Sequence, residues 1–182
     1  TWLLVGIAVV VVLWIIYAFN RLVTLRARID EAFSDIEVQL KRRYDLIPNV
    51  IETVKGYMAH ERGVLENVTK ARTQAMGANT AAEHAQAENA LAGTLKTLFA
   101  VSENYPDLKA NANFLDLQRE LADTENKIQS ARRFYNGNVR DFNVTVGSFP
   151  SMIIAGAFGF KPREFFDLDD NSPAQEPVAV KF

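Results

Sequence analysis

The sequence predicts an all-α protein in which an N-terminal transmembrane helix continues into an elongated antiparallel four-helix bundle. Residues 2–19 carry no charged side chain, which is the first observation behind this prediction. Apolar residues then recur at steps of three and four, and from Phe114 onwards they also repeat every seven positions, as in a coiled coil. This spacing is typical of helices with one buried face, and no strand-like alternation competes with it.

The first element is the apolar segment 2–19. As a helix it would be ~27 Å long, close to the ~30 Å hydrocarbon core of a bilayer. Trp2 and Tyr17 stand near its two ends, where aromatic rings favour the membrane interface. A buried core helix and a cleaved signal peptide are the alternatives, but the length and the lack of a small-residue cleavage signal favour a retained anchor. We therefore expect a single-pass protein of the cell (inner) membrane that contacts the lipid bilayer through residues 2–19.

Charged residues after the apolar segment bear on its orientation. Arg21, Arg26 and Arg28 follow it closely, and basic residues favour the cytoplasmic side. We therefore expect a cytoplasmic C-terminal domain, with an extracytoplasmic domain as the alternative. The chain of 182 residues has a net charge of −2 and no basic face with interleaved aromatic residues, so we expect no nucleic-acid partner.

A continuous helix is expected to leave the membrane, because no glycine or proline lies between Ile7 and Ile47. Pro48 lacks an amide donor and crowds the preceding turn, so it is expected to end or kink this helix. Asp45 and Asn49 are candidates for capping the helix that resumes after it. Asp45, Pro48 and Asn49 together form a predicted helix joint.

Three further helices complete the predicted bundle. One apolar stripe covers 50–75 and another covers about 81–104, and loops at 76–79 and 105–113 separate them from their neighbours. The fourth helix carries the seven-residue seam and is expected to end by Pro150. The seam consists of Phe114, Leu121, Ile128, Tyr135, Phe142 and Phe149.

These patterns divide the chain into a transmembrane anchor at 1–19, a helical bundle at 20–149 and a C-terminal part at 150–182. The C-terminal part begins with an apolar run that is too short to span a membrane. From Asp167 it becomes acidic, and loose order is expected there. The apolar run suits a loop that docks on the bundle, the membrane surface or another subunit. Its candidate partner contacts are Met152, Ile153, Ile154, Phe158 and Phe160.

Polar side chains interrupt the apolar stripes at a few positions. Glu61 lies within the second stripe. Arg132 interrupts the fourth, with Glu125 and Gln118 at seven-residue steps before it. An unpaired buried carboxylate is costly. We therefore predict that Gln118, Glu125 and Arg132 form a partly buried polar ladder opposite Glu61. The alternative is that all four lie in water at the edges of the stripes. The basic run at 41–43 is expected to be a solvated face.

Motifs of enzyme chemistry are absent from the sequence. There is no cysteine, no G-x-S-x-G, no phosphate-binding glycine loop and no dinucleotide-binding turn. His60 and His84 lack ligand partners at helical spacing, so we expect no metal, no cofactor and no catalytic residue. A site made of carboxylates alone is the alternative, and it would make the protein a metal-dependent hydrolase using Glu61, Glu125 and Asp45.

Four stretches resemble a known family. They are QLKRRYDLIPNVIETVKGYMAHE at 39–61, VTKAR at 68–72, ENYPDLKANANFLDLQRELADTENKI at 103–128 and RRFYNGNVRDFN at 132–143. In combination they resemble the LemA family of bacterial membrane-anchored proteins. The resemblance implies a single N-terminal anchor and a long four-helix domain, and it implies no established reaction.

These observations lead to a functional hypothesis in which the protein is a membrane-anchored, non-enzymatic helical scaffold that assembles into a homo-oligomer. Its apolar C-terminal run is the candidate contact, because exposed apolar patches usually have a partner. The first alternative is an accessory or regulatory subunit of a membrane enzyme such as a protease or transporter. The metal-dependent hydrolase is the second alternative.

Overall fold

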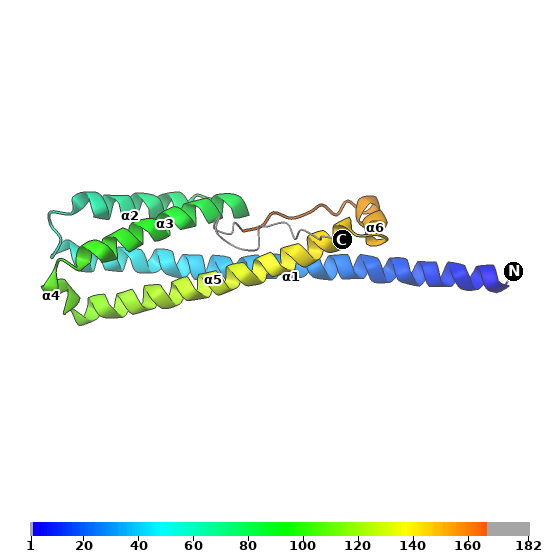
Figure 1. Ribbon diagram of the computed structural model, residues 1–182, viewed down its shortest axis with the longest axis horizontal. Coiled ribbons are helices and arrows are strands. Elements are labelled where there is room, and N and C mark those ends of the chain that lie inside the picture. The colour runs from blue at the N-terminus through cyan, green and yellow to red at the C-terminus, as the bar shows by residue number, and fades with distance from the viewer. Residues whose placement is uncertain (1, 167–182) are drawn as a thin grey trace, which may run out of the picture. The chain divides into compact units, whose positions relative to one another are not determined.

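A computed structural model describes residues 2–166, and the predicted acidic tail from Asp167 lies outside this range. All the secondary-structure elements within this range are helices, as predicted (Figure 1). The helices are α1 (Trp2–Lys55), α2 (Arg62–Met76), α3 (Ala81–Ser102), α4 (Pro106–Lys109), α5 (Ala112–Gly147) and α6 (Ser151–Ala157). The all-α class is therefore confirmed.

The contacts divide the chain into two compact units. Of the described residues, unit 1 comprises 2–36 and 131–164, and unit 2 comprises 37–130 with 165 and 166. Helices α1 and α5 each contribute residues to both units. The predicted boundaries after residues 19 and 149 stay a prediction.

In unit 1, α1 begins with an exposed apolar segment. Most large side chains from Trp2 to Tyr17 are exposed, with Trp2 at 89% and Leu3 at 76%. Among the described helices, α1 is the one that is long and apolar enough to cross a membrane. Beyond this segment one face of the same helix is buried, as its apolar spacing predicts. The buried residues of α1 in unit 1 are Ala18, Leu22, Leu25, Ile29, Ala32 and Ile36.

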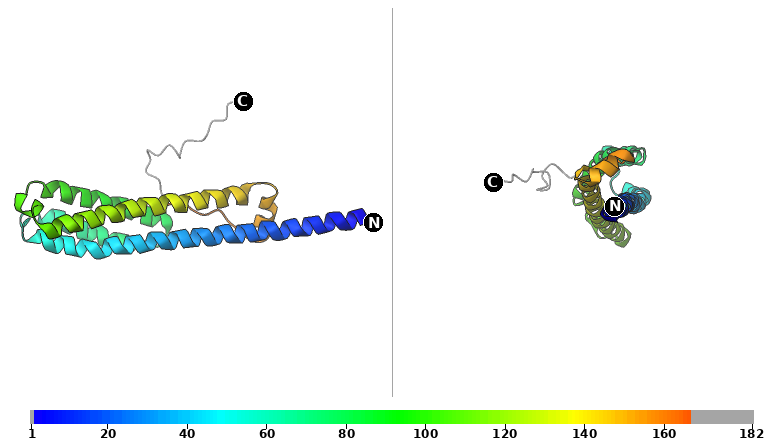
Figure 2. Two further views of the ribbon diagram at one scale, coloured as in Figure 1. Left: turned by 90° about the horizontal axis from the view of Figure 1, so that it is seen from below. Right: turned by 90° about the vertical axis from the view of Figure 1, so that its right-hand side faces the viewer.

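The seven-residue seam of α5 is buried at all but its last position. The buried members are Phe114, Leu121, Ile128, Tyr135 and Phe142. The prediction for Phe149 is wrong: it is 79% exposed, because α5 ends at Gly147 and Phe149 lies in the turn before α6. The apolar run after Pro150 was expected to be a loop, but it forms the short helix α6, which lies beside α1 in Figure 2.

Pro48 was expected to end or kink the first helix; it does not end it, and the kink stays a prediction. Helix α1 continues through Pro48 to Lys55, and the chain turns at Gly56 instead. Asp45 and Asn49 therefore lie inside α1 and cap no helix there. Proline is tolerated because its ring lies on the exposed face of α1 and its missing amide is replaced by another donor, described below.

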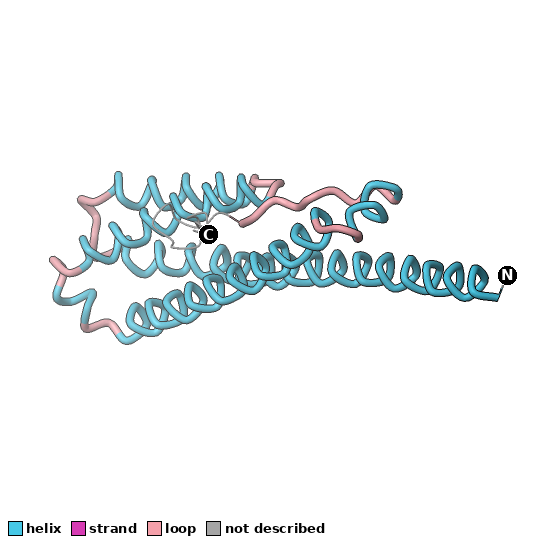
Figure 3. Tube along the Cα trace, turned by 45° about the vertical axis from the view of Figure 1, so that its right-hand side comes forward, coloured by secondary structure: helices cyan, strands magenta, loops and turns pink. Residues whose placement is uncertain are grey.

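Unit 2 contains the rest of the predicted helices. The stripe predicted to begin at Val50 is divided between the end of α1 and helix α2, and α2 packs on α3. Figure 3 shows the short connections between these elements. Helix α3 begins with a capping box, in which Thr80 accepts from the amide of Glu83 and the Glu83 carboxylate accepts from the amide of Thr80. The backbone amides of Asn79 and Thr80 both donate to the Glu83 carboxylate and hold its pKa below its usual value.

Candidate functional site

A buried ionic cluster joins three helices of unit 2. Arg43 of α1 is only 2% exposed and forms ion pairs with Glu88 of α3 and Glu125 of α5. The Tyr44 hydroxyl donates to Glu88, and Gln129 donates to the Glu125 carboxylate at 3.0 Å. Burial raises the pKa of Tyr44, and the positive charge of Arg43 opposes this effect. Because charges of opposite sign meet inside the unit, the cluster is suited to fixing the register of α1, α3 and α5.

The position of this cluster follows from the apolar stripes. Arg43 lies three residues after Leu40 and four before Ile47, both fully or almost fully buried, so the stripe carries its side chain inward. Glu88 lies in the same way between Ala85 and Leu91 on α3. The expectation that the basic run at 41–43 is solvated is therefore wrong for Arg43. The signal that would have found the cluster is a pair of opposite charges, each interrupting an apolar stripe.

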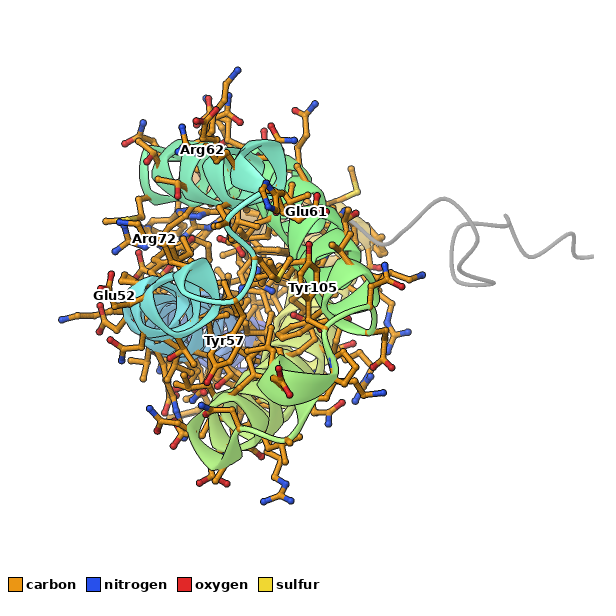
Figure 4. All side chains as sticks on the ribbon, turned by 90° about the vertical axis from the view of Figure 1, so that its left-hand side faces the viewer. Glu52, Tyr57, Glu61, Arg62, Arg72 and Tyr105 are labelled. Carbon is orange, nitrogen blue, oxygen red and sulfur yellow. The ribbon has the colours of Figure 1, made fainter. Side chains whose placement is uncertain are left out.

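The predicted polar ladder is placed differently from expectation in two respects. Glu61 lies just before α2 and is half-buried, and its carboxylate accepts from the Tyr105 hydroxyl at 3.3 Å (Figure 4). Glu125 meets an arginine, but that residue is Arg43 of α1. Arg132 is buried on α5, and Gln118 is half-buried on the same helix. That Glu61 faces Arg132 stays a prediction.

The predicted joint at Pro48 is a point of attachment between two helices. Pro48 has no amide hydrogen, so the carbonyl of Tyr44, four residues earlier, lacks its usual helical donor. Arg72 of α2 donates its Nε–H to that carbonyl at 2.8 Å. Figure 4 labels Arg72 between the two helices. The proline thus exposes a backbone acceptor on α1, and α2 supplies the donor.

This attachment gives a double-mutant prediction. Replacing Arg72 with methionine leaves the Tyr44 carbonyl without its donor and is expected to cost about 1–3 kcal/mol in the free energy of unfolding. In the Pro48→Ala background the backbone regains an amide at position 48, so the same replacement is expected to cost clearly less. Urea unfolding of the four proteins measures the coupling, with exposed Lys70→Met as the control. An equal cost of Arg72→Met in both backgrounds would contradict the assignment.

An open groove lies in unit 2 where the end of α1 meets α2. Its volume is ≈ 620 Å³. Its lining includes the apolar side chains of Ile51, Met58 and Leu65 together with charged ones. The charged residues that line it are Glu52, Lys55, Arg62, Glu66 and Lys70. Mixed charges around an apolar centre are typical of a surface that binds another polypeptide.

An aromatic cluster in unit 1 holds the C-terminal segment. The Phe19 ring lies 4.8 Å from the Phe158 ring and 5.9 Å from the Phe160 ring, measured between centroids. The Phe160 ring also lies 6.4 Å from that of Phe142 on α5. The backbone amide of Phe160 donates to the carbonyl of Ala155 at 2.9 Å. These contacts attach the end of α6 to α1 and α5.

Arg163 fixes the chain that follows α6. Its backbone amide donates to Asn143 Oδ1 at 2.8 Å, and its carbonyl accepts from Asn143 Nδ2 at 2.9 Å. Its guanidinium forms an ion pair with Asp30 of α1. One residue later, the carbonyl of Glu164 accepts from the Tyr135 hydroxyl at 3.0 Å.

The residues predicted to contact a partner fall into two groups. Met152, Ile153 and Phe158 are exposed and available for contact. Ile154 is buried, and Phe160 packs in the aromatic cluster, so these two hold α6 in place instead.

Within residues 2–166, no three histidine, cysteine, aspartate or glutamate side chains come close enough to hold an ion. Asp45 and His60 are exposed, and His84 is half-buried. The carboxylates of Glu61 and Glu125 have the different neighbours described above.

Comparison with known proteins identifies relatives over most of the chain. The sequence model of the LemA family matches residues 32–182. Magnetosome protein MamQ 2 of Paramagnetospirillum magneticum is 22% identical over 174 residues, covering 81% of this chain and 64% of the relative. MamQ of Magnetospirillum gryphiswaldense matches to the same extent. Protein LemA of Metamycoplasma hominis is 26% identical over 140 residues, covering 75% of this chain and 63% of the relative. The chain thus spans less than two thirds of the length of these relatives.

Proposed function

Because the chain belongs to the LemA family, we propose that it is a membrane-anchored, non-enzymatic scaffold whose helices form an elongated antiparallel four-helix bundle. The observation that carries this proposal is the exposure of the apolar N-terminal part of α1. Side chains such as Leu4 and Leu13 are more than half exposed, and a bilayer would remove this continuous surface from water.

The ionic cluster supports a structural role for the helical domain. Arg43 binds both Glu88 and Glu125, so these charges serve to hold three helices together. A rigid domain on a membrane anchor is suited to positioning other proteins or further copies of itself. The family resemblance and the 22% identity to magnetosome proteins are compatible with this role and assign no reaction.

Self-assembly is the part of the proposal with a direct test. Large apolar side chains are also exposed beyond the anchor, for example Val38 and Phe134, and such side chains are available to a second copy. We expect the full-length protein, extracted in mild detergent and transferred to nanodiscs, to give one dominant oligomer in mass photometry. A purely monomeric protein over the whole concentration range would contradict self-assembly.

The groove beside α1 and α2 favours a second candidate function, that of an accessory subunit of a membrane enzyme. In that case a protease or transporter is expected to copurify in stoichiometric amount from gently solubilised membranes. Leu65→Glu in the groove is expected to remove it, and Glu120→Leu on the exposed face of α5 is expected to retain it. A copurifying enzyme that survives Leu65→Glu would show that the groove is not its binding site.

We also propose that the helical domain lies on the cytoplasmic side of the cell (inner) membrane. Exposed Arg21, Arg26 and Arg28 after the apolar segment support this orientation. A fluorescent reporter that folds only in the cytoplasm, fused after residue 182, is expected to fluoresce. A dark reporter together with an active periplasmic phosphatase fusion would place the domain outside.

A further inference from the structure

Unit 1 places α6 at the end of the apolar segment of α1. Phe19 is among the last residues before the first charge, Arg21. If residues 2–17 lie in hydrocarbon, Phe19 lies at the boundary between acyl chains and headgroups. The rings of Phe158 and Phe160 contact Phe19, so the segment 149–160, here named the α6 segment, lies at the same depth.

The α6 segment is held firmly, with one face turned inward. Ile154 and Ala155 are buried, whereas Phe149, Met152 and Ile153 are exposed. The hydrogen bonds between Asn143 and Arg163 fix the chain just beyond it. The exposed apolar face is therefore presented by a fixed element.

The charged residues next to this segment are mainly basic. The sequence contains no acidic residue between Asp141 and Glu164, and none before Asp30. Asp30 is paired with Arg163. The exposed charge nearest in sequence to the apolar face is Lys161, and the next acidic residue, Glu164, lies beyond Arg163. Exposed Arg21 follows Phe19 by two residues, and the Phe19 ring contacts Phe158. A cationic border around an apolar face is typical of elements that lie in the interface of an anionic membrane.

We propose that the α6 segment is a second membrane contact, which lies in the headgroup region and inserts Phe149, Ile153 and Phe158 toward the acyl chains. This inference rests on the proposed anchoring by α1. We assign the lipid bilayer as the partner of this exposed face because the face lies at the same depth as the end of the lipid-facing surface of α1. An interfacial element of this kind reaches about 5–10 Å into the boundary, which matches its position beside Phe19 and short of the hydrocarbon centre. Together with α1 it would restrict the rotation and tilt of unit 1 on the membrane.

The chain lacks cysteine, so single cysteines can report the depth of chosen positions. Full-length variants Val10→Cys, Phe158→Cys and Phe134→Cys carry an environment-sensitive fluorophore in nanodiscs of phosphatidylcholine and phosphatidylglycerol. Phe134 is the matched control, because it is 59% exposed and Phe158 is 58% exposed. It neighbours Tyr135, whose ring contacts Phe33 of α1, about 20 Å along the helix from Phe19. Ile153→Cys repeats the measurement at a position outside the aromatic cluster.

Nitroxide-labelled lipids then quench each fluorophore according to depth. We expect strong quenching at positions 153 and 158 by a shallow nitroxide and little by a deep one, strong quenching at position 10 by the deep nitroxide, and no lipid quenching at position 134. Quenching at position 10 with none at 153 and 158 would overturn the α6 contact and leave the anchor standing. No quenching at position 10 would overturn the anchor itself. Labels at 153 and 158 that are shielded from aqueous iodide but not quenched by lipid would show that protein covers this face, which also overturns the proposal.

Discussion

Replacing Arg43 with methionine is expected to lower the free energy of unfolding of unit 2 by about 3–5 kcal/mol, because the change leaves Glu88 charged and buried without its partner. Glu88 is only 1% exposed, so water cannot replace the guanidinium. Tyr44 still donates to its carboxylate, but one neutral hydroxyl does not compensate a buried charge. Hydrogen exchange of core amides in residues 37–130 of the detergent-solubilised full-length chain measures the loss.

Two further variants separate this explanation from a simple loss of packing. Arg42→Met changes the neighbouring arginine, which is largely solvated and lies 3.9 Å from Asp123, and it is expected to cost less than about 1 kcal/mol. The double variant Arg43→Met/Glu88→Gln removes both charges and keeps an acceptor for Tyr44, so it is expected to recover most of the stability. A double variant as unstable as Arg43→Met would show that the charge pair is not the cause.

Replacing Phe142 with alanine is expected to destabilise unit 1 by about 3–5 kcal/mol, because it opens a cavity in a closely packed site. Phe142 is buried and its ring contacts that of Phe160. Its removal takes away the support of α5 for the chain after α6. We therefore expect faster hydrogen exchange both in α5 after residue 131 and in residues 151–160.

Phe134→Ala is the matched control, since it makes the same change on the same helix at an exposed position. Its expected effect is within about 0.5 kcal/mol. If both variants had the same small effect, the aromatic cluster would not be what attaches α6. A large effect of Phe142→Ala on α5 that spares residues 151–160 would show that α6 is held by the Arg163 contacts instead.

The regular elements were largely predictable because their signal is local. The apolar segment of α1, the start of α3 at Ala81 and the buried heptads of α5 follow from residue spacing and capping within one helix. The errors had two causes, a donor supplied from another helix at Pro48 and a helix that ends before its apolar seam does at Phe149. Pro48 does not end α1, since Arg72 supplies the missing donor. Phe149 leaves the seam, because the chain turns there toward α6.

The candidate site was less predictable than the helices. Arg43 was expected in water although it interrupts an apolar stripe, and its partner Glu125 is 82 residues away in the sequence. Glu125 was predicted to lie in a ladder with Arg132, seven residues away on the same helix, whereas its ion pair is with Arg43 of α1. Helical spacing alone could not rank the two arginines. Which residues of the α6 segment are exposed and which are buried could not be predicted from the sequence, because Ile153 and Ile154 are adjacent and chemically alike.

Periodicity and composition alone determined that this chain is helical and that its first helix begins with an uncharged apolar segment, whereas the LemA resemblance came from specific sequence motifs. Only the tertiary structure decided which charges meet, where α1 stops and which apolar side chains of α6 remain exposed. The reason is physical: a helix is stabilised by neighbours within four residues, whereas a buried charge or an unpaired carbonyl is satisfied by any donor that folding brings within about 3 Å.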